Sequence, residues 1–149
     1  MDNPDRRFVT EAVAGKRTDI PFDTNPQLCA LSTRLVKGEP GELTLSFIAG
    51  PQTEQGNGVV SGGAMATMLD SGMAMAVLSR LAVGQTCSSI SMTINMMRPA
   101  KLGKLLVRAK VDRLGRQVAF ASATLTDEEG REVANAVSSL IIASVARTA

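Results

Sequence analysis

A single acidic residue, Asp70, lies in the middle of a long apolar run and is the first candidate for chemistry. It is the only charged residue between Gln55 and Ser79. A carboxylate in such surroundings is disfavoured unless it is paired, hydrogen-bonded or used. The structural alternative is that Asp70 accepts hydrogen bonds from a neighbouring loop or forms a salt bridge. Burial alone favours neither explanation, because structural pairs also hold buried carboxylates.

Two glycines, Gly62 and Gly63, precede Asp70 at the start of the same apolar run. If a helix begins there, the backbone N–H groups of its first turn have no acceptor within the helix, and the helix dipole makes them partly positive. Such groups could stabilise an oxyanion formed from an acyl carbonyl. The alternative, which we favour for Gly63, is that the glycines only permit close packing at the junction between loop and helix.

Other polar residues could also take part, although each is by itself more typical of exposed surface. Gln55 offers an amide N–H to a carbonyl or a water. Ser88, Ser89 and Ser91 offer hydroxyl groups at the start of an expected strand. Four basic residues at turns and strand ends could meet phosphate groups, namely Arg98, Lys101, Arg113 and Arg116.

The sequence contains no histidine, which limits the chemistry more than any other feature of its composition. Ser-His-Asp and Cys-His triads, His-ligated zinc and a histidine general base are all excluded. The two cysteines, Cys29 and Cys87, have neither CxxC spacing nor the number of a disulfide framework. We therefore expect no metal site and a reducing, cytoplasmic compartment. Any chemistry must use carboxylates, hydroxyls, amides, Lys, Arg and backbone groups.

The composition is that of an ordinary globular domain of 149 residues, with 44% apolar and 20% charged residues. A formal charge of +2, scattered basic residues and only 3% aromatic residues argue against a nucleic-acid partner. The polar start M-D-N-P-D-R-R-F lacks the apolar core of a signal peptide. Residues 58–78 are apolar, but Asp70 and four glycines within them argue against a membrane span.

The pattern of apolar residues predicts an α+β fold built around one long helix. We expect a short helix over residues 4–14 and an irregular connection over residues 15–27. Alternating apolar and polar residues predict strands, of which the first is the weakest, over residues 28–36, 41–49, 86–97, 104–112, 117–126 and 132–143.

The helix over residues 62–81, with Ser61 as its N-cap, is apolar almost all round. A helix with no polar face must be enclosed on every side. The order strand–strand–helix–four-strand meander therefore predicts an antiparallel sheet wrapped around this helix, with a second subunit helping to cover it.

The run Q-G-N-G-V-V-S-G-G-A-M-A-T-M-L-D, residues 55–70, resembles the signature of hotdog-fold acyl-CoA thioesterases of the phenylacetate-degradation (PaaI-like) type. In that signature an Asn or Gln, and a Gly three residues later, precede His-Gly-Gly, and a catalytic Asp or Glu follows nine residues after the His. Two further runs resemble the family's next elements: a strand and turn, T-I-N-M-M-R-P-A-K-L-G, and the following hairpin, R-L-G-R-Q-V-A-F. Together the match covers residues 55–143. The resemblance implies a single hotdog domain over residues 1–149, of which residues 1–27 are a lead-in.

The resemblance also implies a reaction: hydrolysis of an acyl-CoA or aroyl-CoA without metal or redox cofactor, coenzyme A being part of the substrate. Asp70 would be the nucleophile or the general base for a water, and the Gly62 N–H would polarise the carbonyl. Gln55 would position the carbonyl or the water, and Ser89 would orient the water. The remaining residues expected at the substrate are Ser61, Gly63, Asn95, Arg98 and Arg116. In a homodimer or homotetramer, Asp70 of one subunit would face Gly62 of the other.

One position departs from the signature, because Ser61 stands where the family has His. A Ser can still cap the helix and donate one hydrogen bond, so the resemblance is compatible with a weakened enzyme. It is also compatible with an alternative, a hotdog protein that binds acyl-CoA without hydrolysing it. Hotdog dehydratases and hydratases need a His and are excluded.

Overall fold

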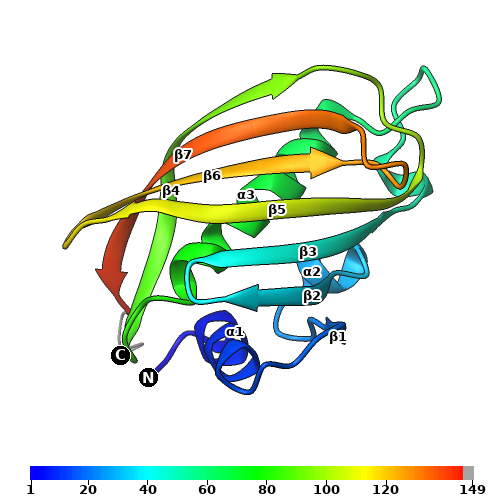
Figure 1. Ribbon diagram of the computed structural model, residues 1–149. Helices are drawn as coiled ribbons and strands as arrows, with labels where there is room; N and C mark the ends of the chain where they lie inside the picture. Colours follow the sequence, from blue (N-terminus) through cyan, green and yellow to red (C-terminus); the bar gives the residue numbers. More distant parts are fainter. Residues whose placement is uncertain (146–149) are drawn as a thin grey trace.

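A computed structural model describes residues 1–145 and shows one antiparallel sheet of seven strands curved around a long helix (Figure 1). The elements in chain order are α1 (Pro4–Ala14), β1 (Ile20–Pro21), α2 (Pro26–Ala30), β2 (Arg34–Glu39), β3 (Glu42–Ala49), the short 3-10 helix η1 (Pro51–Thr53), α3 (Gly62–Leu78), β4 (Gln85–Met96), β5 (Gly103–Leu114), β6 (Val118–Thr126) and β7 (Glu132–Ser144). The predicted fold class is confirmed. Residues 146–149 of the predicted domain lie outside the described residues.

The start of α3 is fixed by Ser61, whose Oγ accepts a hydrogen bond of 3.1 Å from the Ala64 N–H, as predicted for an N-cap. The helix ends at Leu78, before the predicted residue 81. Ser79 Oγ donates to the carbonyl of Ala76 at 2.7 Å and accepts from the Gly41 N–H at 2.8 Å, which ties the helix end to the turn before β3. Within residues 1–145, no helix combines the length and apolar character needed to cross a membrane.

The order of strands in the sheet is β1-β2-β3-β5-β6-β7-β4, which corrects one part of the predicted meander. Strands β5, β6 and β7 do form a meander, but β4 pairs with β7 and not with β5. The reason is that β3 pairs with β5 along its whole length, so both sides of β5 are occupied. Residues 97–102 therefore carry the chain across the end of the sheet, and β4 becomes an edge strand (Figure 1).

The weakest predicted strand, residues 28–36, is wrong in its first half. Residues 26–30 form the helix α2, because Pro26 occupies its first turn and Asn25 Oδ1 caps it by accepting from the Leu28 N–H at 2.9 Å. Strand β2 starts only at Arg34. The connection over residues 15–27 is also less irregular than predicted. It contains the two-residue strand β1, which pairs with β2, and the start of α2.

The core lies between the sheet and one side of α3. Met68, Leu69 and Met73 of the helix are fully buried there. The other side of α3 carries Ala66, Asp70 and Ala74, which remain half-buried. Thus one face of the helix, with small residues on either side of one carboxylate, is partly open within one chain.

Candidate active site

The Asp70 carboxylate lies midway along α3 and, among residues 1–145, has one hydrogen-bond partner. Its Oδ1 accepts a bond of 2.5 Å from Ser89 Oγ of β4. Over residues 1–145, Asp70 forms no salt bridge, so that alternative explanation of its presence is wrong. The hydrogen bond also comes from a strand rather than from a loop. Ser89 therefore holds one carboxylate oxygen and leaves the other available to a water or a substrate.

Ser89 reaches Asp70 because β4 contains a β-bulge. The pairing of β4 with β7 shifts between Ser89 and Ser91, with Ile90 as the extra residue. Before the bulge, Cys87 and Ser89 face α3; after it, Met92 faces the core. An uninterrupted alternation would have placed Ser89 on the opposite face of the strand from Met92.

The thiol of Cys87 lies close to this pair and is excluded as a nucleophile. It donates to the carbonyl of Ala74 in α3 at 3.8 Å. Burial and the negative charge of Asp70 raise the pKa of Cys87 to about 12. Since the thiolate is the reactive form of cysteine, a thiol that remains protonated at neutral pH is inert.

A second group of expected site residues meets at the N-terminus of α3. The Ser61 N–H donates to the carbonyl of Thr53 at 2.8 Å, and the Val60 N–H to that of Ala100 at 2.9 Å. These bonds fix the helix start between η1 and the segment after β4. The Gly62 N–H donates to no atom of the described part of the chain. It is thus a free donor at the positive end of a helix dipole.

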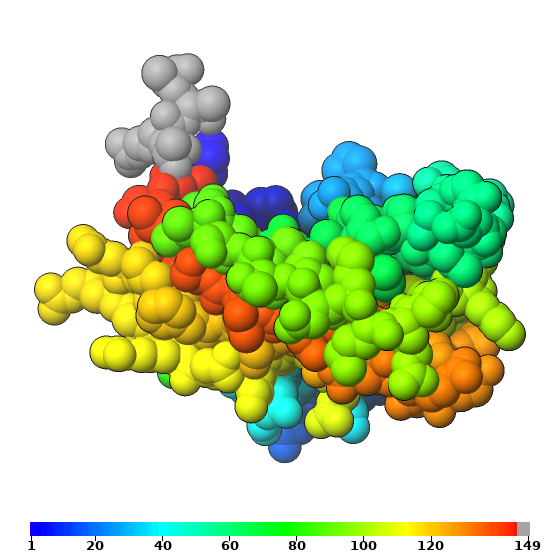
Figure 2. Space-filling model, turned by 90° about the horizontal axis from the view of Figure 1, so that it is seen from above, coloured from blue at the N-terminus to red at the C-terminus, as the bar shows by residue number. Residues whose placement is uncertain are grey.

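An open groove of about 550 Å³ lies beside this helix start. Its walls combine apolar and polar side chains, namely Gln55, Asn57, Val59, Val60, Met65, Met96, Met97, Arg98 and Pro99. Figure 2 shows the surface on which β4 and the following segment (light and yellow green) lie beside the loop that precedes α3 (blue green). Of the expected residues, Gln55 and Arg98 therefore lie together near Gly62.

The two glycines differ in a way opposite to our expectation. A methyl group at Gly63 would have no heavy atom within 4 Å, so close packing does not explain this residue. A methyl group at Gly62 would lie 2.8 Å from Met96 Sδ. Close packing therefore applies to Gly62. Met96 thus lies directly against the candidate carbonyl-binding residue.

Within one chain the two groups of site residues are separate. Asp70 follows Gly62 by eight positions in α3. A helix rises 1.5 Å per residue, so about 12 Å of helix separates them. A single thioester carbonyl could not contact both in the same chain.

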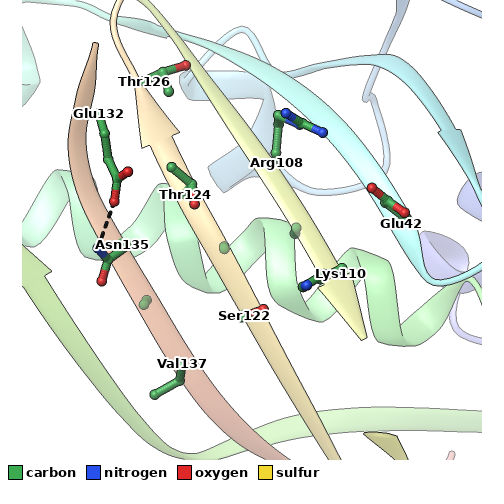
Figure 3. Close-up of a pocket in the computed structure, with 12 residues that line it drawn as sticks. Glu42, Arg108, Lys110, Ser122, Thr124, Thr126, Glu132, Asn135 and Val137 are labelled. Atoms are coloured by element: carbon green, nitrogen blue, oxygen red, sulfur yellow. Dashed lines mark hydrogen bonds between the residues drawn. The ribbon is translucent and has the colours of Figure 1, made fainter. Parts of the chain in front are cut away.

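Two other expected residues lie away from both groups. Asn95 Nδ2 donates to Asn135 Oδ1 at 2.9 Å, and Asn135 belongs to a shallow hollow on the sheet face turned away from α3 (Figure 3). Arg116 is exposed in the turn between β5 and β6. That turn lies at the opposite end of β5 from Arg98, which precedes the strand. The structure therefore joins neither Asn95 nor Arg116 to Asp70 or Gly62.

Comparison with known proteins gives a consistent result. The model of the Thioesterase superfamily matches residues 57–134. Human acyl-coenzyme A thioesterase 13 is 33% identical over 95 residues, which are 63% of this chain and 67% of the relative. A phenylacetic acid degradation-related protein of Ralstonia eutropha JMP134 has a similar structure, with a TM-score of 0.75 and 28% identity over 80% of this chain and 93% of that one. A Streptococcus mutans protein solved with bound acetyl-CoA has a TM-score of 0.69 and 22% identity, over 76% and 90% of the two chains.

Proposed function

This chain belongs to the Thioesterase superfamily, and from that membership we propose that it hydrolyses an acyl- or aroyl-coenzyme A by means of the Asp70 carboxylate. The predictions of a PaaI-like hotdog thioesterase and of a thioester hydrolase are confirmed by the family match and the relatives. The observation that carries the proposal for Asp70 is its geometry: a half-buried carboxylate with one oxygen held by Ser89 and no cation paired with it in residues 1–145.

In the proposed reaction, the free oxygen of Asp70 acts on the thioester in one of two ways. As general base, it takes a proton from a water whose oxygen attacks the carbonyl carbon, and the tetrahedral intermediate expels the coenzyme A thiolate, which takes up the proton. As nucleophile, it forms a mixed anhydride and releases coenzyme A, and water then hydrolyses the anhydride. In both cases the Gly62 N–H donates to the oxygen on which negative charge develops, and Gln55 donates its amide N–H beside it. No metal or redox cofactor takes part.

The proposed site lies between two subunits, so that Asp70 of one faces Gly62 of the other. Three features support this arrangement. About 12 Å of helix separates the two residues in one chain. The open face of α3 around Asp70 carries the small residues Ala66 and Ala74, which let two helices approach closely. Finally, β4 is an edge strand whose unpaired backbone groups are ready to pair with another chain. The substrate class follows the names of the relatives: an acyl-coenzyme A thioesterase and a protein with bound acetyl-CoA.

The test is release of free thiol from a panel of acyl- and aroyl-CoA esters. Asp70→Asn keeps the shape of the side chain but loses its charge and basicity, so we expect the rate to fall by about 100- to 10,000-fold. Asp112→Asn is the matched control. Ser122 Oγ donates to Asp112 at 3.2 Å, which makes a second Ser–Asp pair, and Ser122 lies on the outer sheet face (Figure 3). We expect the rate of this variant to stay within about twofold of wild type, as for ordinary surface substitutions.

The possible outcomes separate the two functions considered for this fold. Equal rates in wild type and Asp70→Asn would refute the role of the carboxylate. Calorimetric binding of the CoA esters, with no hydrolysis of any, would instead favour the non-catalytic alternative raised by Ser61. Because the free thiol of Cys29 is exposed to thiol reagents, the signal of substrate-free protein has to be subtracted.

A further inference from the structure

The end of β4 places a flexible side chain against the residue proposed to bind the thioester carbonyl. A carbon atom attached to Gly62 Cα would lie 2.8 Å from Sδ and 3.0 Å from Cε of Met96. These distances are well inside the 3.5–4.0 Å at which non-bonded atoms normally meet. Met96 is nevertheless 49% exposed, so its thioether rests on the first turn of α3 without being locked into the core.

Beyond Met96, the groove continues along apolar side chains. Met65 is only 5% exposed, and Val59, Val60 and Pro99 line the same groove. Polar groups enter it from Gln55, Asn57 and Arg98. Gly62 adjoins the groove where Val60 and Met96 line it, so an acyl group whose carbonyl accepts from the Gly62 N–H has a path into the groove past Met96. The later carbons can then follow the apolar part of the groove.

Resting on the proposed function, we propose that Met96 is a specificity-determining residue that selects acyl groups by their width next to the carbonyl. A straight acyl chain is narrow at this point and needs only a rotation of the unbranched thioether. An α-branched or aromatic acyl group is wide at this point and would require Met96 to leave the first turn of α3 altogether. The preferred substrates are therefore straight-chain acyl-CoA esters with an apolar chain. In a pocket of this kind, one carbon more or less changes the specificity by about 10- to 200-fold.

The experiment compares wild type, Met96→Ala and Met96→Leu on hexanoyl-CoA, 2-methylhexanoyl-CoA and benzoyl-CoA. In Met96→Ala the wall is truncated, so we expect kcat/KM for the two wide substrates to rise by about tenfold relative to hexanoyl-CoA. In Met96→Leu the volume is conserved, so the wild-type preference should remain. Val137→Ala is the matched control: it also truncates an exposed apolar side chain, but on the outer sheet face, away from the groove (Figure 3). We expect it to leave the preference unchanged.

Binding gives a second readout that does not depend on turnover. Ketone analogues of the same esters, in which a CH2 group replaces the thioester sulfur, cannot be hydrolysed, and calorimetry gives their Kd values. Wild type should bind the hexanoyl analogue at least tenfold more tightly than the benzoyl analogue, and Met96→Ala should reduce this ratio to below threefold. If Met96→Ala changes all substrates and analogues by the same factor, the inference is wrong although the proposed hydrolysis stands. If the binding ratios change as expected but no ester is hydrolysed, Met96 retains its role and the proposed function fails.

Discussion

Gly72 sets how closely α3 approaches the sheet, and its replacement by alanine should not stabilise the protein although alanine is the better helix former. In a helix interior, Gly→Ala is favourable by about 1 kcal/mol. At Gly72 the added methyl would lie 2.5 Å from Cγ1 of Val107 in β5, about 1 Å inside normal contact. Overpacking of this kind costs about 1–3 kcal/mol. The expected result for Gly72→Ala is therefore a free energy of unfolding between about 0 and 2 kcal/mol lower than wild type.

The sign of the effect should reverse when Val107 is truncated. Val107 is fully buried, and Val107→Ala alone should lower the free energy of unfolding by about 1–3 kcal/mol. In that background the clash is absent, so Gly72→Ala should stabilise by about 1 kcal/mol. Gly63→Ala is a control in the same helix, because a methyl group there has nothing within 4 Å and should not destabilise.

The assay is urea unfolding followed by far-UV circular dichroism, since the sequence has no Trp or Tyr for intrinsic fluorescence. The chain concentration must be the same throughout, because association adds to apparent stability. If Gly72→Ala raised the free energy of unfolding by about 1 kcal/mol in the wild-type background, the added methyl group would fit between α3 and β5 without a clash, and the reasoning would be refuted.

Two further predictions concern the subunit arrangement and pH. Mixing Asp70→Asn with Gly62→Pro should restore about one quarter of wild-type activity, because half of the dimers are mixed and each has one intact site. Pro removes the N–H, is suited to the first helical position and follows Ser61 in an extended conformation, and its added ring displaces only the flexible end of Met96. Mixtures as inactive as the single variants would place each site within one chain. The Arg6 guanidinium holds the pKa of the Asp2 carboxyl well below its usual range. The ion pair with Arg6 therefore stabilises the folded state fully above the ordinary Asp pKa of about 3.9, and this stabilisation is lost as pH falls below it. The Tm difference between wild type and Asp2→Asn should shrink below about pH 4. A Tm difference that stays unchanged down to about pH 2 would contradict this.

Much of the sheet could be predicted because alternation reports which face a side chain occupies. In β5, for example, Leu105, Val107 and Ala109 are buried and alternate with exposed Arg108 and Lys110. Alternation does not report which strand lies next to which, and so the pairing of β4 with β7 was missed. The helix α2 was missed for a different reason. A short apolar segment fits strand and helix equally well, and only Asn25 before Pro26 marked a helix start.

The candidate site could be predicted in part, and the limit has a physical cause. Asp70 and Gly62 stand out because a charge in an apolar helix and a glycine in its first turn are both unusual. Ser89 came only from the family resemblance, because the bulge at Ile90 reverses the alternation and carries no clear sequence signal. The contact of Met96 with Gly62 could not be predicted, since it depends on the approach of β4 to the helix start.

The serine in the position of the family's histidine leaves free the backbone donor that the proposed reaction uses. Ser61 Oγ accepts from the Ala64 N–H, the third donor of the helix, and leaves the first donor, Gly62, unbonded within residues 1–145. A cap that bonded Gly62 itself would occupy the proposed carbonyl position. The substitution therefore removes an imidazole but keeps both the positive helix end and its free N–H. On this argument the chemistry depends on the Asp70 carboxylate and the Gly62 N–H, and Ser61 contributes by fixing the direction in which that N–H points.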